Sequence, residues 1–257
     1  MANYHLEVGV ISRRKCQSIV NSVSYICGKV LNDSYNGKTY YNQRKDVLQF
    51  KIFLPNCAPP QLNQLQGLCD AVNKAEKRED ARTARVFIGS LPNELALNEQ
   101  SKIVERFVNN NFVSIGLCAI TAIHAGKNEN EPERNNPHVH IIVPTRTVES
   151  NGFYDKKNRE WNKRKYINIW REDWANEQNL AYERNGLNIR VSHESLDVQG
   201  KDQEPTIHLS RIDWKKEQLG ERTIAGDMKR AIKKRNDERV YQKRLEKENN
   251  LEVELFI

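Results

Sequence analysis

The sequence predicts an α+β protein with four or five strands and several helices, followed by a charged helical extension. Short apolar segments alternate with segments whose apolar residues recur at helical spacing. A hydrophobic content of 38% in 257 residues is enough for a sizeable core. From about residue 225 the chain is highly charged and has few apolar positions. We therefore expect a domain at residues 1–224 and a helical extension at residues 225–257.

The strands are predicted from apolar runs that end at turn residues. Segment 47–54 alternates apolar and polar residues and stops at Pro55, whereas 117–124 is continuously apolar and is expected to be buried. An Asn36-Gly37 turn signal lies in the polar segment before the first of these two. The predicted strands are 3–11, 47–54, 83–90, 117–124 and 138–146.

The helices are predicted from apolar residues three or four positions apart. Segment 16–30 has this spacing at Ile19, Val23, Ile26 and Val30. A second helix begins after two prolines, which the first turn of a helix tolerates. Residues 187–222 show no clear periodicity beyond a short apolar piece. The predicted helices are 16–30, 60–79, 97–112, 168–185 and a last one from about 225.

Charge and cysteine usage narrow the classes of partner and compartment. The formal charge of +7 favours an anionic partner, of which nucleic acid is the first candidate. The cysteines are odd in number and none forms a CxxC pair, which disfavours a disulfide framework or a thiolate zinc site. The N-terminus has no apolar signal-peptide run and no segment has the length of a membrane span, so we expect a cytoplasmic protein.

Three histidines form the most specific chemical pattern. His138 and His140 lie two residues apart in a predicted strand, so both imidazoles project from one face of the sheet. His124 ends the preceding predicted strand and would lie beside them if the two strands pair. Three neutral imidazoles could hold a metal ion with open positions for a phosphate oxygen. The alternative is that His138 and His140 are two semi-exposed histidines without a ligand.

The chain resembles relaxases of the MobA/MobL type, the MOBQ group, from about residue 3 to 235. The string Ala122-Ile-His124-Ala-Gly followed by Asn136-Pro-His138-Val-His140 is similar to the histidine motif of that family. Similar segments occur in the family's order at Tyr4-His5-Leu6, Gly37-Lys38-Thr39, Ala71 to Lys77, Leu91-Pro92-Asn93-Glu94 and Gln199 to Leu209.

The resemblance implies an HUH endonuclease fold, in which a central antiparallel sheet carries the two-histidine strand. It implies that the histidines bind Mg²⁺ or Mn²⁺ and that a tyrosine attacks one phosphodiester at a plasmid origin of transfer. The products are a 5′-phosphotyrosine and a free 3′-hydroxyl, so the strand can later be rejoined. The implied partner is single-stranded DNA at the hairpin and nick site of that origin, with accessory mobilisation or coupling proteins.

The tyrosine that matches the family's nucleophile is Tyr25, in the first predicted helix. It shares a mostly polar helical face with Gln17, Ser18 and Asn21, as expected beside an open cleft. The alternative role is an amphipathic tyrosine that covers the core. Tyr40 or Tyr41 in the following polar segment would be a second choice of nucleophile.

One position departs from the family's pattern. Relatives often have a glutamate just after the arginine that matches Arg85, and Val86 stands there in this sequence. A carboxylate near metal-binding histidines orients them, so its absence puts full catalytic competence in doubt. Glu76, Glu79 or Asp80 are candidates to replace it.

Two basic segments are predicted to contact DNA. One precedes the helix that contains Tyr25, and the other mixes cations with aromatic residues, a composition typical of single-strand binding. The alternative for both is a solvated basic loop. The candidate residues are Arg13, Arg14, Lys15, Lys156, Lys157, Trp161, Lys163 and Arg164.

The leading hypothesis is therefore a metal-dependent relaxase that nicks DNA for conjugative mobilisation. One alternative is a DNA-binding remnant of the same fold that binds the origin or represses its own promoter, and it is motivated by Val86. Another is a replication-initiation nickase, which would share the mechanism but act at a replication origin.

Overall fold

The computed structural model describes residues 4–126 and 135–254. Contacts between residues divide the chain into two compact units, Met1–His193 and Glu194–Ile257. The division falls before the boundary at residue 224 that the sequence pattern suggested. The boundary at residue 224 stays a prediction, because a division by contacts does not show which residues belong to one functional domain.

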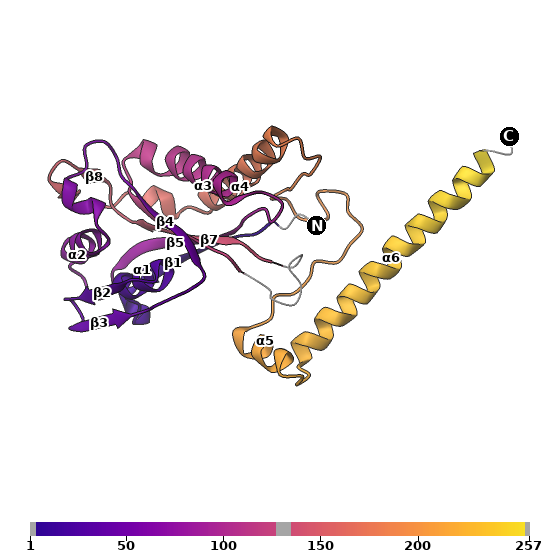
Figure 1. The fold of residues 1–257 in the computed structure, drawn as a ribbon, viewed down its shortest axis with the longest axis horizontal. Coiled ribbons are helices and arrows are strands. Elements are labelled where there is room, and N and C mark those ends of the chain that lie inside the picture. The colour runs from indigo at the N-terminus through magenta and orange to yellow at the C-terminus, as the bar shows by residue number, and fades with distance from the viewer. Residues whose placement is uncertain (1–3, 127–134, 255–257) are drawn as a thin grey trace. The chain divides into compact units, whose positions relative to one another are not determined.

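A five-stranded antiparallel sheet forms the centre of the first unit (Figure 1). The strand order is β1-β5-β7-β6-β4 and each neighbouring pair is antiparallel, which confirms the predicted architecture. The central strand β7 contains His138 and His140. The strands are β1 (Leu6–Ser12), β4 (Val47–Phe53), β5 (Arg82–Ser90), β6 (Ala119–His124) and β7 (His138–Pro144).

Helices cover both faces of this sheet. The face that carries Val139 and Ile141 packs against α3 (Leu97–Asn111) and α4 (Arg164–Arg184), in a core rich in aromatic rings. The ring of Phe87, for example, contacts those of Phe107, Phe112 and Trp170. The opposite face packs against α1 (Ile19–Cys27) and α2 (Leu65–Ala75), and its core consists mainly of aliphatic side chains and buried cysteines. The two histidines of β7 project from this second face.

Local signals set both ends of α1. The Ser18 side chain accepts a hydrogen bond from the backbone N–H of Asn21, and this caps the first turn. The helix ends at Gly28, whose φ of 63° lies in the left-handed region that glycine adopts without strain. The helix is therefore shorter than the predicted 16–30, because Ser18 and Gly28 stop it from inside that range.

Two short hairpins were not predicted. β2 (Val30–Asp33) and β3 (Lys38–Tyr41) pair across the Asn36-Gly37 turn, and β8 (Val148–Glu149) pairs with β9 (Gly152–Phe153). In β2 only Leu31 and Asp33 are buried, so the apolar pattern is too short to indicate a strand. The turn itself was predicted correctly, since Gly37 has a φ of 62°.

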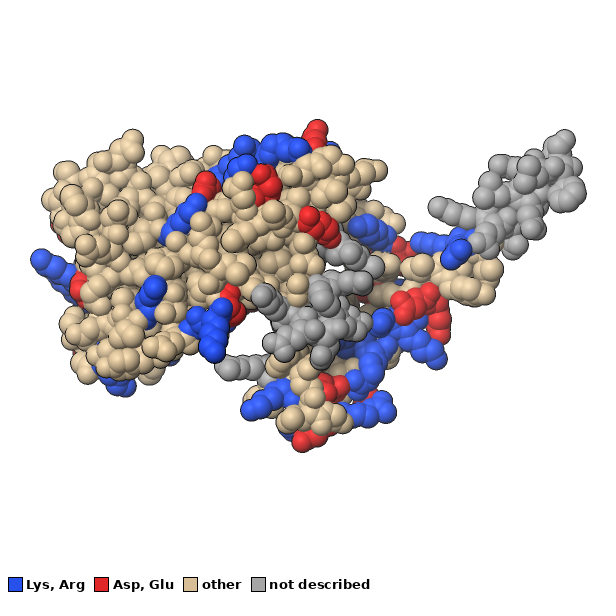
Figure 2. All heavy atoms as spheres, in the orientation of Figure 1, with Lys and Arg blue, Asp and Glu red and all other residues tan. Residues whose placement is uncertain are grey.

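The second unit contains two helices, α5 (Arg211–Gln218) and α6 (Ile224–Glu254). The predicted charged helix is confirmed as α6, whereas α5 was missed because its apolar side chains, such as Trp214, are exposed rather than packed. Glu204 binds Arg235 and Arg239, and these ion pairs join the segment before α5 to α6. Figure 2 shows Lys and Arg side chains gathered along this unit.

Within the described ranges, none of the helices combines the length and the apolar composition that a membrane crossing requires.

Candidate active site

The three predicted histidines lie together on the α1-facing side of the sheet. His124 pairs with His138 across β6 and β7, and His140 is the next residue on the same face of β7. Their ring centroids lie 4.7–5.3 Å apart. One nitrogen of each ring falls within 4.8 Å of the other two, so the three can act on one ligand.

Hydrogen bonds fix which nitrogen atoms of two of these rings are free. Nε2 of His124 donates to the Ile26 carbonyl oxygen at 2.7 Å, so Nδ1 of that ring bears the lone pair. This Nδ1 is buried and has no hydrogen-bond partner. Nδ1 of His138 donates to the Asn136 carbonyl oxygen at 2.8 Å, which leaves its Nε2 free. The backbone therefore orients two imidazoles as ligands, in the way that ring partners orient metal-bound histidines.

Burial favours the uncharged form of His124 and His140. Desolvation lowers the pKa of His140 to about 3 and lowers that of His124, with a further contribution from the neighbouring positive groups. Neutral imidazole is the form that binds a metal ion. The unpartnered buried nitrogen of His124 and the two further ring nitrogens beside it fit a divalent metal ion.

Arg44 and Asp46 form an ion pair beside this cluster that was not predicted. The Arg44 guanidinium donates two hydrogen bonds to the Asp46 carboxylate, one of them from Nε at 2.8 Å. This pairing lowers the pKa of Asp46 to about 2. One Asp46 oxygen lies 3.9 Å from Nδ1 of His124, so a carboxylate faces the unpaired nitrogen.

Tyr25 lies on α1 in the residue before Ile26, whose carbonyl accepts from His124. Its side chain is 48% exposed, and the Arg44 guanidinium lies over its ring at 4.4 Å from the centroid. Tyr25, Arg44, Asp46 and His124 thus form a continuous series of contacts. The structure brings the predicted nucleophile and the predicted metal ligands into one site, and the catalytic role of Tyr25 stays a prediction.

The other tyrosines of this region lie on β3. The Tyr40 side chain is partly buried against the aliphatic core, and its carbonyl oxygen accepts from the Ser24 hydroxyl. Tyr41 is 75% exposed. Its exposure makes it a suitable control for Tyr25 in experiments.

The predicted DNA-contacting cations lie near the end of the sheet away from the histidines. Arg13 donates to backbone oxygens of Glu76 and Arg78 and stacks on Tyr35, so it joins the first 3₁₀ turn (Arg13–Lys15) to the end of α2. Arg14 and Lys15 are exposed. Lys156 and Lys157 line a basic pocket that is also lined by Glu76 and Arg78, the residues to which Arg13 donates.

The remaining predicted contacts lie at the start of α4. Lys163 forms an exposed ion pair with Glu160, and Arg164 is exposed at the first position of the helix. Trp161 is only 9% exposed and packs in the aromatic core. Its ring therefore offers little surface on which a base could stack.

The expectation that an acid near residue 80 replaces the missing glutamate is wrong for the described residues. Glu76 binds Arg146 and Lys157, and Asp80 binds Arg78, at the end of the sheet away from the histidines. Val86 lies on the same face of the sheet as His140. Its partner on β7 is Ile142, the next residue after His140 on that face. The acid that lies beside the cluster is Asp46.

Sequence spacing gave no signal for Asp46, because its proximity depends on pairing between distant strands. Val47, the first residue of β4, pairs with His124, and the Ala125 N–H donates to the Asp46 carbonyl at 2.9 Å. The useful clue would have been an Arg-x-Asp sequence directly before a strand that pairs with the histidine strand.

Comparison with known proteins adds independent observations. The family model "MobA/MobL family" matches residues 17–218. The "Probable mobilization protein MobA" of Bifidobacterium longum is 28% identical over 92% of this chain and 48% of its own length. The "Mobilization protein MobL" of Acidithiobacillus ferridurans is 26% identical over 81% of this chain and 62% of its own length. This chain spans about half the length of the Bifidobacterium protein.

A solved structure described as "Molecular Basis of Vancomycin Resistance Transfer in Staphylococcus aureus" superposes with a TM-score of 0.67. Its sequence is 28% identical, and the match covers 76% of this chain and all of that one. The family model extends over most of the chain, including the histidine strands and the helix of Tyr25. The chain therefore belongs to the MobA/MobL family.

Proposed function

We propose that this chain is a relaxase that cuts one DNA strand at a plasmid origin of transfer and becomes linked to the 5′ end. The observation that supports this most directly is the hydrogen bond from His124 to the Ile26 carbonyl. This hydrogen bond joins His124, one of the three clustered histidines, to the residue that follows Tyr25. The contact supports a site in which the proposed metal ligands act together with the proposed nucleophile.

The proposed reaction exchanges one phosphate ester for another. The Tyr25 hydroxyl oxygen attacks the phosphorus atom, and the bond from phosphorus to the 3′ oxygen breaks. The phenol loses one proton and the departing 3′ oxygen gains one, so the balance requires neither water nor a nucleotide cofactor. The reverse reaction rejoins the strand.

The histidines are proposed to hold a divalent metal ion, Mg²⁺ or Mn²⁺. The donor atoms would be Nδ1 of His124, Nε2 of His138 and one ring nitrogen of His140. A bound cation would supply Lewis-acid stabilisation of charge on the phosphate oxygens.

Arg44 is proposed to orient Tyr25 and to contact the phosphate. Its guanidinium already lies over the Tyr25 ring and is held there by Asp46. A planar guanidinium can donate further hydrogen bonds to phosphate oxygens. Asp46 has a pKa of about 2, which makes it a poor proton acceptor, so its role is to hold Arg44 and to face His124.

We further propose that residues 1–224 form the nicking domain and that residues 225–257 form a helical extension. The substrate would be single-stranded DNA at the hairpin and nick site, in the cytoplasm, with accessory mobilisation or coupling proteins. The exposed predicted cations Arg14, Lys15, Lys163 and Arg164 remain candidates for DNA contact. The reading as an inactive remnant loses its motivation, because Asp46 supplies an acid beside the histidines.

The test is detection of the covalent intermediate by mass spectrometry. The protein would be incubated with Mn²⁺ and single-stranded oligonucleotides that tile the DNA next to its gene. We expect an oligonucleotide fragment on the peptide that contains Tyr25. Tyr25→Phe should abolish the adduct, whereas the matched variant Tyr41→Phe should retain it. An adduct that persists in Tyr25→Phe would overturn the assignment of the nucleophile.

A further inference from the structure

A cavity of about 150 Å³ lies on the face of the sheet that packs against α3 and α4. It is lined by the end of α3 with the turn after it, by the start of α4, and by Arg85 and Val143, which pair between β5 and β7. The three histidines project from the opposite face of the same sheet. This hollow, the aromatic cavity, is therefore separate from the histidine site.

Aromatic side chains form much of the wall of the aromatic cavity. They are Phe112, Trp161, Tyr166 and Trp170. The Trp170 ring lies 5.9 Å from that of Phe112 and 6.0 Å from that of Tyr166, measured between centroids. Aromatic rings at such distances attract one another in edge-to-face or offset arrangements. The wall is therefore suited to a ligand that contributes one more flat ring.

The size and the rim of the aromatic cavity also favour a ring. A volume of about 150 Å³ between apolar side chains is enough for one molecule of benzene. Ile115 and Ile169 line the cavity and are 46% and 47% exposed, so they lie at its rim. An apolar ring can therefore enter past two aliphatic side chains.

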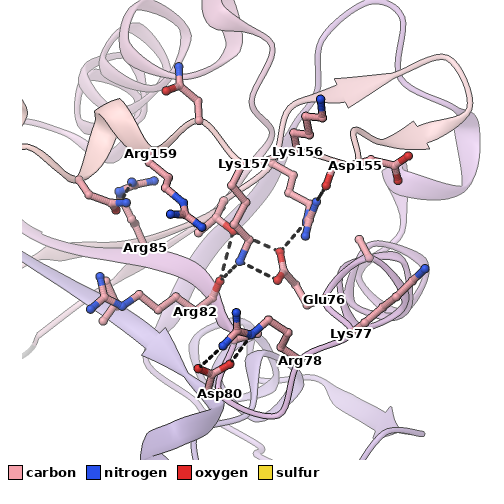
Figure 3. A pocket seen from close by; sticks show the side chains of 17 residues that line it. Glu76, Lys77, Arg78, Asp80, Arg82, Arg85, Asp155, Lys156, Lys157 and Arg159 are labelled. Carbon is pink, nitrogen blue, oxygen red and sulfur yellow. Dashed lines mark hydrogen bonds and ion pairs between the residues drawn. The ribbon is translucent and has the colours of Figure 1, made fainter.

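Arg85 is the one charged residue among the described side chains that line the aromatic cavity. It is 6% exposed, and its guanidinium lies 5.9 Å from the centroid of the Trp170 ring. Its Nη2 donates a hydrogen bond to the Asn162 side chain at 2.8 Å. Within the described part of the chain Arg85 forms no ion pair, and Figure 3 draws no dashed line from it to an acidic side chain. A buried cation therefore lines the cavity without a carboxylate beside it.

The Arg85 side chain donates only this one hydrogen bond to the described residues. A guanidinium carries several N–H donors in a planar fork, and a carboxylate accepts two of them at once. Burial lowers the pKa of Arg85, and the charge of Arg82 lowers it further, because both disfavour the charged form. A carboxylate bound against Arg85 would offset this cost and complete its hydrogen bonding.

We propose that the aromatic cavity binds a small aromatic carboxylate, with the ring among the aromatic side chains and the carboxylate on the Arg85 guanidinium. A neutral ring would leave Arg85 without a counter-charge. An aliphatic anion such as acetate would leave the aromatic wall uncovered. The inference goes beyond the proposed function, since the ligand is neither DNA nor a metal ion and binds on the other face of the sheet.

The experiment compares three probes that separate charge from shape. The comparison is needed because Arg85 also lines the basic pocket, where any anion gains affinity from the surrounding cations. Benzoate has the ring and the carboxylate, benzyl alcohol has the ring without the charge, and acetate has the charge without the ring. Saturation-transfer nuclear magnetic resonance on the full chain, without DNA, measures the dissociation constant of each.

We expect benzoate to bind saturably and at least about tenfold tighter than benzyl alcohol or acetate, since a charge-assisted hydrogen bond adds to the contacts of the ring. Equal affinities for benzoate and acetate would show an anion held by basic residues alone. Equal affinities for benzoate and benzyl alcohol would show an apolar cavity in which Arg85 takes no part. Either result, or no saturable benzoate binding below about 10 mM, would overturn the proposal.

Arg85→Met tests the guanidinium itself, because methionine keeps an unbranched side chain and removes the charge. Benzoate affinity should fall at least about tenfold, to that of benzyl alcohol, whose own affinity should change less than about twofold. The matched control is Arg106→Met, since Arg106 is exposed on α3 and does not line the cavity. This control should change neither affinity by more than about twofold. Equal losses of benzoate binding in the two variants would contradict the role of Arg85.

A pair of substitutions at the rim keeps the proposal testable if Arg85→Met does not fold. Ile169 is nearly half exposed on α4, so Ile169→Lys and Ile169→Glu should both fold. The added positive charge should favour the bound carboxylate and the added negative charge should disfavour it, with benzoate affinities at least about threefold apart. Benzyl alcohol, which is uncharged, should bind both variants equally. Benzoate affinities that do not differ between the two variants would overturn the proposal.

Discussion

The two ends of the central sheet use charge in opposite ways. At the end that contains His124, His138 and His140, three ring nitrogens converge, and the buried Nδ1 of His124 has no hydrogen-bond partner. At the other end, permanent cations surround one buried carboxylate, Glu76. The first arrangement suits a ligand that forms directed bonds to nitrogen. The second suits a diffuse anion, and only the second should weaken steeply with salt.

The same local motif occurs at both ends and gives an internal reference. Arg44 and Asp46 form an Arg-x-Asp ion pair, and Arg78 and Asp80 form another. The first faces His124 and carries Tyr25 on its guanidinium, whereas the second is exposed at the rim of the basic pocket. If equivalent substitutions in the two ion pairs have different effects on activity, the cause is the position of each pair in the fold and not the Arg-x-Asp sequence that both share.

Replacing a histidine of the cluster should produce the largest effect. His138→Ala or His140→Ala should lower the rate of adduct formation at least about 100-fold, because each removes one nitrogen donor from the metal set. Calorimetric titration with Mn²⁺ should show a matching loss of affinity. His193→Ala, which lies outside the cluster, should leave both unchanged. Unaltered Mn²⁺ affinity in both cluster variants would refute the metal site.

Asp46→Asn should have the next largest effect. Arg44 loses its charged partner and moves from the Tyr25 ring, so the rate of adduct formation should fall about 10- to 100-fold. Asp80→Asn is the matched control in the second Arg-x-Asp pair and should change the rate less than about twofold. Equal losses in the two variants would show that proximity to His124 does not matter.

The smallest predicted effect is on stability and concerns the buried acid Glu177. Unlike Glu76, it forms no ion pair with a lysine or arginine among the described residues. Glu177 on α4 is 5% exposed, and one of its oxygens has no hydrogen-bond partner. Burial raises the pKa of Glu177, so the folded state holds this proton more tightly than the unfolded state does. Stability is then highest below the unfolded pKa and falls as pH rises through the interval up to the folded pKa.

Glu177→Gln removes this titration. At neutral pH it should stabilise the protein by about 1 kcal/mol, and the advantage should shrink toward pH 4. Thermal melts over that pH range measure it. A variant that is less stable than the parent at neutral pH would show that the carboxylate is better accommodated than its contacts suggest.

The sequence predicted those parts of the fold whose apolar pattern is long or continuous. All five central strands and the helices α1 to α4 were found, because each buries a face with the proper period. The hairpin of β2 and β3 was missed, since Tyr41 and most of its other side chains are exposed. The helix α5 was missed for the same reason.

The site was predictable where its residues share one element and not where pairing brings them together. His138 and His140 follow from a period of two in a single strand. Asp46 lies near His124 only because β4 pairs with β6. Glu76 meets Arg146 and Lys157 across three segments, which no local spacing could indicate.

The hydrogen bond between His124 and the Ile26 carbonyl limits how Tyr25, the proposed nucleophile, can move. It fastens the backbone beside Tyr25 to the sheet, so the remaining freedom of Tyr25 lies in its two side-chain torsions. Exchanging one divalent ion for another would then alter reaction rate through the ion's own chemistry, without displacing the helix. The tautomer of His124 therefore connects α1 to the histidine cluster. The proton on its Nε2 binds the Ile26 carbonyl of α1, and for that reason its Nδ1 carries the free lone pair.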